Sequence, residues 1–199
     1  MPDVQKIKKW PSALLAALLF SCTLTLFGPA QIFLTNSLEF KFGFFHLLPY
    51  LGIVAVSVFL VLALVLFLLP CRFRLHERGV AFVLASGLLL WFQGNILLWQ
   101  YGALSGHEIA WGEKALNGLI DTPLWAAALI LALWRPGFLY RRAKAFSLLF
   151  LAIQLLSVSI TVSRQPEMPS FKKYQFDRMV EFDFSSRQNV IVLILDSFQ

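Results

Sequence analysis

The stretch LLPYLGIVAVSVFLVLALVLFLL, residues 47–69, contains 23 residues and no charged side chain. A helix needs about 20 mostly apolar residues to cross the hydrocarbon core of a bilayer. Buried helices and strands of water-soluble proteins rarely run this long without a charge. Because backbone amides in lipid must be hydrogen-bonded within their own segment, we interpret the stretch as a transmembrane helix.

Three further segments share this character and predict three more membrane-spanning helices. Residues 13–34, 79–98 and 145–163 carry no charged side chain. The composition agrees, because 58% of the 199 residues are hydrophobic and only 14% are charged. Average soluble domains have about 45–50% apolar and about 25% charged residues. This composition disfavours an ordinary water-soluble globule and excludes a disordered chain.

A fifth span is predicted at residues 119–139, although its apolar centre is shorter. Residues 122–134 form an uncharged run of only 13 residues, which covers about 20 Å at 1.5 Å per residue. Arg135 can extend its charge to the headgroups while the helix continues toward Tyr140. The alternative is a re-entrant or interfacial segment.

The basic residues gather on alternate connections between the predicted helices. Ten of the 17 precede the first helix or lie between the second and third or the fourth and fifth: Lys6, Lys8, Lys9, Arg72, Arg74, Arg78, Arg135, Arg141, Arg142 and Lys144. Five helices place all ten on one side, which the positive-inside rule makes the cytoplasmic side. We therefore expect a multi-pass protein of the cell inner membrane, with a cytoplasmic N-terminus and an extracytoplasmic C-terminus. If the first span is instead a cleaved signal peptide, the orientation of the rest is unchanged.

The position of these charges also bears on partners. Basic residues that adjoin membrane spans favour the anionic headgroups of a lipid bilayer over nucleic acid. The net charge of +6 therefore does not indicate a nucleic-acid-binding protein.

The chain changes character after residue 163, where the predicted five-helix domain (residues 1–163) ends. Residues 164–188 hold nine charged side chains and two prolines, which predicts an extracytoplasmic linker. Residues 189–199 then read NVIVLILDSFQ. Their apolar run, residues 190–195, is too short to cross a membrane and predicts a β-strand buried on both faces. Because such a strand needs partner strands and covering helices, we expect it to begin a truncated α/β domain.

The motif Asn-Val-Ile-Val-Leu-Ile-Leu-Asp-Ser within residues 189–199 resembles the opening strand of the sulfatase-like branch of the alkaline phosphatase superfamily. It is most similar to the membrane-bound members: lipoteichoic acid synthases, phosphoglycerol transferases and phosphoethanolamine transferases. Lipoteichoic acid synthase-type proteins also begin with five transmembrane helices, followed by a linker and an extracellular catalytic domain. The motif covers under a tenth of the chain, and the topological likeness of the rest is loose because many proteins have five spans.

This resemblance implies a metal-dependent transferase or hydrolase of phosphate or sulfate esters at the outer face of the membrane, with lipid-linked substrates. It implies that Asp196 is the first carboxylate ligand of a divalent metal ion in the full-length protein. The alternative is that Asp196 caps a following helix or turn. Ser197 does not match the nucleophile of the family, which lies further downstream. We therefore expect the segment itself to be inactive and to bind no metal.

A function of another class stays open, namely a non-enzymatic integral membrane protein such as a transporter or an assembly subunit. It predicts that the chain ends naturally at Gln199 and that the tail pairs with a partner's sheet. The five spans show no internal repeat, which weakens the transporter hypothesis. The oligomeric state is not indicated by any pattern in the sequence.

Five more polar residues complete the candidates. We expect Gln93, Asn95 and Gln154 to hydrogen-bond across helices, with the lining of a functional cavity as the alternative. His76 and His107 each begin an incomplete His-Glu-x-x-His pattern. We expect His76 to be a solvated loop residue. His107 belongs to an outer loop, where contact with a lipid headgroup or a catalytic domain is the alternative to an ordinary interfacial role.

Overall fold

The computed structural model describes residues 10–37, 40, 42–70, 74–97 and 115–164. Within these ranges the regular elements are all helices: α2 (Trp10–Cys22), the π-helix η1 (Thr23–Phe27), α3 (Gly28–Thr35), α4 (Phe44–Leu68), α5 (Leu75–Asn95), α6 (Ala115–Trp134) and α7 (Pro136–Arg164). Because α2, η1 and α3 are continuous, they form one span. With α4, α5, α6 and α7 they give five helices that are long and apolar enough to cross a membrane. The prediction of five helices that are long and apolar enough to cross a membrane is confirmed. The predicted strand in residues 189–199 lies outside the described residues.

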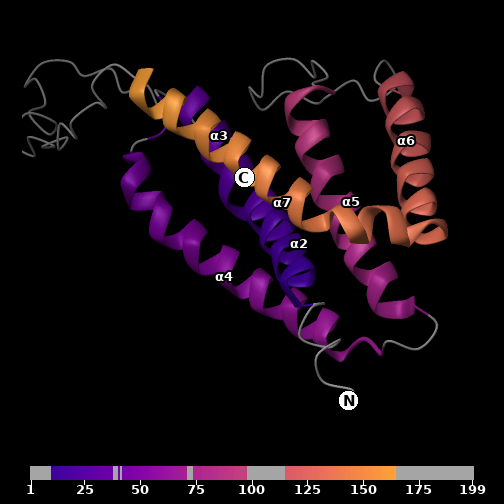
Figure 1. Ribbon diagram of the computed structural model, residues 1–199. Helices are drawn as coiled ribbons and strands as arrows, with labels where there is room; N and C mark the ends of the chain where they lie inside the picture. Colours follow the sequence, from indigo (N-terminus) through magenta and orange to yellow (C-terminus); the bar gives the residue numbers. More distant parts are fainter. Residues whose placement is uncertain (1–9, 38–39, 41, 71–73, 98–114, 165–199) are drawn as a thin grey trace, which may run out of the picture.

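The first span forms the centre of the bundle. Figure 1 shows α2 and α7 crossing, with α4 on one side and α5 and α6 on the other; α2 packs against α4, α5 and α7. Ala13, Ala16 and Ala17 of α2 have at most 2% of their surface exposed. Small side chains let helix backbones approach closely, which is the main source of packing energy between helices in lipid.

The outside of the bundle is covered by large apolar side chains. On α4, for example, Ile53 is 65% exposed and Leu68 is 67% exposed, and on α6 Leu119 is 69% exposed. A soluble monomer rarely exposes such a continuous apolar surface. The surface is compatible with a lipid bilayer around the helices, as the partner prediction requires.

The first span widens into the π-helix η1 because of a proline one turn further on. Pro29 has no N–H, and in a regular α-helix its ring would clash with the carbonyl of Thr25, four residues earlier. In the widened turn the N–H of Gly28 donates to the carbonyl of Thr23, five residues earlier. A Cβ atom at position 28 would lie 3.1 Å from that carbonyl oxygen, so glycine leaves room for the wide turn.

The junction of α6 and α7 differs from the sequence prediction. The fourth helix ends at Trp134 and not near residue 139, and α7 begins at once with Pro136. Proline disfavours the helical conformation in the residue before it, yet it fits the first position of a new helix, where no N–H donor is needed. Three basic residues expected in a connection therefore lie on the first turns of α7: Arg141, Arg142 and Lys144.

α7 is the longest helix and crosses the bundle obliquely (Figure 1). It has 29 residues and begins next to α6. Near its other end, Val158 and Val162 pack against a cluster that includes Phe33 of α3 and Phe44 of α4. The helix therefore connects the two sides of the bundle.

Contacts between helix ends define one end of the bundle. The ring of Trp10 at the start of α2 lies 4.5 Å from that of Phe67 at the end of α4. The ring of His76 at the start of α5 lies 6.1 Å from that of Tyr140 near the start of α7. We call this the basic end, because it carries every described Lys and Arg except Arg164: Arg74, Arg78, Arg135, Arg141, Arg142 and Lys144.

Gly87 is the point of closest approach between α5 and α2, and replacing it with valine should weaken the bundle. A Cβ atom at Gly87 would lie 3.2 Å from the Cα of Phe20 and 3.3 Å from its backbone nitrogen. Overpacking of this kind costs about 1–3 kcal/mol. Thermal unfolding of the purified protein in detergent, followed by circular dichroism, should show a lower midpoint for Gly87→Val.

The matched control is Gly94→Val, because a Cβ atom at Gly94, also in α5, meets no atom within 4 Å. Both variants carry the same change in helix propensity, because each replaces a glycine of α5 with valine. Equal midpoints for the two variants would contradict the close α2–α5 contact.

Candidate functional site

Several of the residues singled out in the sequence lie outside the described residues. They are Asp196, the predicted metal ligand, together with Ser197 and His107. Within the described part, no group of three or more His, Cys, Asp or Glu side chains is placed to hold a metal ion. The divalent metal and the role of Asp196 therefore stay predictions, and the site that the structure does describe lies among the helices.

A polar cluster joins α5 to α6 at the end of these helices opposite the basic end. Gln93 donates a hydrogen bond from Nε2 to Oδ2 of Asp121 over 3.0 Å. Trp125 donates from Nε1 to Oε1 of Gln93 over 3.2 Å. We call Gln93, Asp121 and Trp125 the α5–α6 polar cluster. Ionisable residues within membrane helices are rare and are commonly functional, which makes this cluster a candidate site.

A second polar contact lies in the centre of the bundle, at the π-helix. Gln154 of α7, only 4% exposed, donates from Nε2 to Oγ1 of Thr23 over 2.9 Å. Thr23 in turn donates to the carbonyl of Leu19 over 2.7 Å, and Ser21 donates to the carbonyl of Ala55 in α4. These bonds join α7 and α4 to the first span.

The prediction of bonding across helices is confirmed for two of its three residues. Gln93 reaches α6 and Gln154 reaches η1. Asn95 instead donates to the carbonyl of Trp91, one turn earlier in its own helix, over 2.8 Å. Asn95 is exposed near the end of α5, and in the described part its side chain bonds to its own helix.

An apolar cavity of about 400 Å³ lies between α5, α6 and α7. Arg135 is the charged residue in its lining, which is otherwise apolar: Ala85, Leu88, Leu89, Phe92, Ala128, Leu131, Ala132, Phe138 and Leu139. Phe92, Leu131 and Phe138 are each 44% or more exposed, so the cavity opens to the surface that faces lipid. It occupies the α5–α6 seam between the polar cluster and the basic end.

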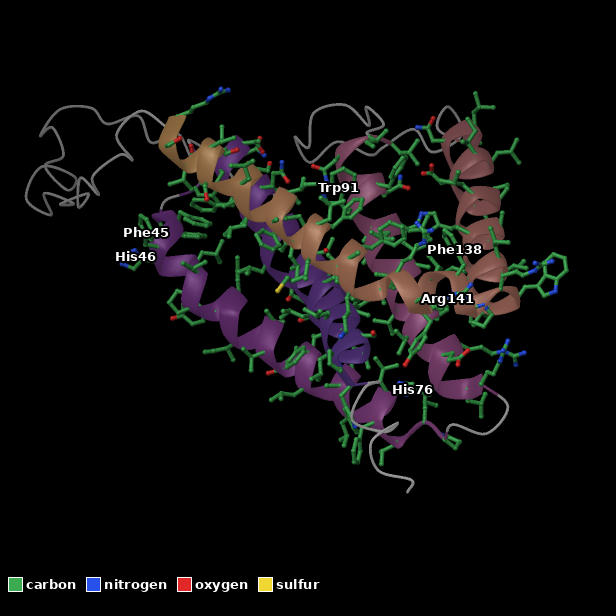
Figure 2. All side chains as sticks on the ribbon, in the orientation of Figure 1. Phe45, His46, His76, Trp91, Phe138 and Arg141 are labelled. Carbon is green, nitrogen blue, oxygen red and sulfur yellow. The ribbon has the colours of Figure 1, made fainter. Side chains whose placement is uncertain are left out.

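Two arginines each lie over an aromatic ring near the junction of α6 and α7. The guanidinium carbon of Arg135 lies 5.7 Å from the ring centre of Trp134. That of Arg142 lies 4.9 Å from the ring centre of Phe138. Figure 2 shows Phe138 and Arg141 close together at the start of α7. Of these residues, Arg135 and Phe138 belong to the lining of the cavity.

The described residues provide no carboxylate partner for these two arginines. The described residues include two carboxylates. Glu77 lies 3.8 Å from Arg74, and Asp121 lies near the other end of α6. The seam is therefore acidic and polar at one end, apolar in the middle and basic at the other end.

The prediction that His76 is a solvated loop residue is wrong. His76 lies in the first turn of α5, is 8% exposed and contacts the carbonyl of Leu66 through Nδ1 at 3.0 Å. Its Nε2 has no hydrogen-bond partner among the described residues. The error follows from the helix boundary, because α5 begins at Leu75 and not at residue 79. The spacing of His76, Val80 and Leu84 along one helix face is the signal that could have placed it.

Comparison with known proteins gives no assignment for this chain. It matches no known protein family, no curated protein and no solved structure. A function must therefore be argued from the chain's own residues: a membrane-embedded bundle, a polar cluster and an apolar cavity with Arg135 in its lining.

Removing Gln93 should destabilise the packing of α6 against α5. Gln93→Leu leaves both the Asp121 carboxylate and the Trp125 indole N–H without this partner. Loss of a hydrogen bond costs about 0.5–1.5 kcal/mol, and about 1.5–3 kcal/mol when one of the two groups is charged. We expect a lower unfolding midpoint in detergent, measured by circular dichroism.

Asn95→Leu in the same helix is the matched control, since Asn95 bonds only to its own helix in the described part. Its midpoint should stay close to that of the unmodified protein. A Gln93→Leu variant as stable as Asn95→Leu would refute a structural role for the α5–α6 polar cluster.

Proposed function

We propose that this chain is the membrane anchor of a sulfatase-like, metal-dependent enzyme that transfers or hydrolyses phosphate or sulfate esters at the outer face of the cell inner membrane. The observation that carries the proposal is the course of α7, which starts at the basic end and finishes at the opposite end with Arg164. The positive-inside rule places the basic end in the cytoplasm. Residues 189–199, which carry the resemblance to sulfatase-like enzymes, then follow on the outer side.

Attachment to a bundle of this kind suits an enzyme with lipid-linked substrates. A catalytic domain held by the chain after Arg164 stays near the bilayer surface, where such substrates are confined. Tethering raises the effective concentration of substrate at the site and favours its orientation. The bundle thereby contributes to turnover without supplying a reacting group.

The metal site of this enzyme begins with Asp196. A carboxylate at the end of a rigid strand is a good ligand for a hard divalent cation. When bound, the ion supplies polarisation of an ester oxygen. One carboxylate does not retain a metal, so the further ligands and the nucleophile belong to sequence beyond the motif.

The α5–α6 polar cluster favours a second candidate, a non-enzymatic transporter or assembly subunit, because ionisable groups among membrane helices often line transport paths or interfaces. The two functions differ in the size of the native product. Intact-mass spectrometry of the endogenous protein should give a mass well above 22.6 kDa for the enzyme. A native mass of 22.6 kDa would favour the non-enzymatic function.

The orientation can be tested by cysteine labelling in intact cells. Cysteines introduced at Ser37 and Ser170 should react with a membrane-impermeant maleimide, because five spans place both on the outer side. The native Cys71, in the connection before α5, should react only after the cells are opened. Protection of Ser170→Cys in intact cells would overturn the five-span orientation.

The role of Asp196 can be tested in the full-length enzyme. Asp196→Asn should lower both metal affinity and metal-dependent activity. The loss should exceed roughly 10–100-fold, which is the cost of losing a residue that only supports a metal ligand. Ser197→Ala is the matched control and should keep its activity, since Ser197 does not match the family's nucleophile. An active Asp196→Asn enzyme with unchanged metal affinity would exclude the ligand role.

A further inference from the structure

We propose that the cavity between α5, α6 and α7 binds an acyl chain of an anionic phospholipid, whose phosphate is held by Arg135 at the basic end. The proposal is independent of the proposed enzymatic function, because it concerns the bundle alone. It assigns a ligand to the apolar cavity that α5, α6 and α7 line.

The cavity has the properties of a site for a hydrocarbon chain. Its volume of about 400 Å³ lies within the range of about 300–1,000 Å³ that ligand cavities occupy. Its lining is apolar and it opens where Phe92 and Leu131 are exposed. In a bilayer, this opening faces lipid tails and not water. An acyl chain of a neighbouring lipid can therefore enter the cavity.

Arg135 lines this cavity where the main chain passes from α6 to α7. It is the single residue between the end of α6 and Pro136, the first residue of α7. Its N–H still donates to the carbonyl of Leu131 over 2.9 Å, which fixes the main chain there. A guanidinium group matches a phosphate with two parallel hydrogen bonds, and basic pockets between helices on the cytoplasmic side commonly bind anionic headgroups.

Charge decides which lipid fits. Arg142 stacks on Phe138, another residue of the cavity lining, and Arg141 and Lys144 lie on the same turns of α7. Within the described residues the basic end has one carboxylate, Glu77, and it lies against Arg74. The positive charge of the basic end attracts a lipid phosphate most strongly when the headgroup has no ammonium group of its own. The site therefore favours phosphatidylglycerol, which is anionic, over phosphatidylcholine, which carries an ammonium group. A lipid that entered from the opposite end would bring its phosphate toward the Asp121 carboxylate.

The headgroup part is tested by native mass spectrometry of the delipidated full chain in detergent. Dioleoyl-phosphatidylglycerol should be retained as one copy, with an affinity at least about tenfold above that of dioleoyl-phosphatidylcholine. Arg135→Gln should abolish the preference. Arg78→Gln, an exposed arginine of the same end on α5, should keep it. Equal retention of the two lipids by the unmodified chain would overturn the proposal.

The acyl-chain part is tested by filling the cavity. Ala128→Phe should lower phosphatidylglycerol retention at least about tenfold, whereas Ala126→Phe, on the exposed face of the same helix, should not. If Ala128→Phe lowers the thermal midpoint, Ala128→Leu is measured in its place. Unchanged retention in a folded Ala128 variant would exclude the cavity. Displacement of the lipid by inorganic phosphate alone would also count against it, since the site needs the chain as well as the phosphate.

Discussion

The hydrocarbon core of a bilayer offers no hydrogen-bond partner, and this structure follows from that constraint. Every backbone amide within a span must bond inside its own segment, which makes each span a helix. The same requirement acts on side chains: Ser21 and Thr23 donate to carbonyls, and Gln154 donates to Thr23. Where Pro29 removes a donor, the helix does not break. Instead it widens at η1, where the N–H of Gly28 donates to a carbonyl five residues earlier and not four.

The second requirement is close contact without a hydrophobic driving force between helices. Lipid tails are as apolar as leucine, so burial alone does not hold a bundle together in the membrane. The chain places small residues where helices meet, with Ala16 and Ala17 on α2 and Gly87 on α5. Large residues such as Ile53 remain on the outside. In a soluble protein, by contrast, so many large apolar residues would not remain exposed.

The five spans could be predicted because a long run without charge is a local property, as residues 47–69 illustrate. The cost of an isolated amide in lipid likewise predicted that Gln154 would bond across helices. Its partner could not be predicted, since Thr23 is 131 positions away and depends on how the helices pack. The interpretation of His76 failed for a smaller reason: a boundary placed four residues late moved it from a buried helix face to a loop. Asp196 lies outside the described residues, and its role remains a prediction.

The length of α7 has a mechanical consequence. Its 29 residues extend about 44 Å at 1.5 Å per residue, while the hydrocarbon core is about 30 Å thick. A helix with this excess inclines or protrudes, and the choice varies with the thickness of the surrounding membrane. Because α7 packs against α2 and α5, its inclination is set by these neighbours as well as by the lipid. A thinner bilayer would therefore tilt the bundle as a whole, and α7 with its terminal Arg164 would tilt with it.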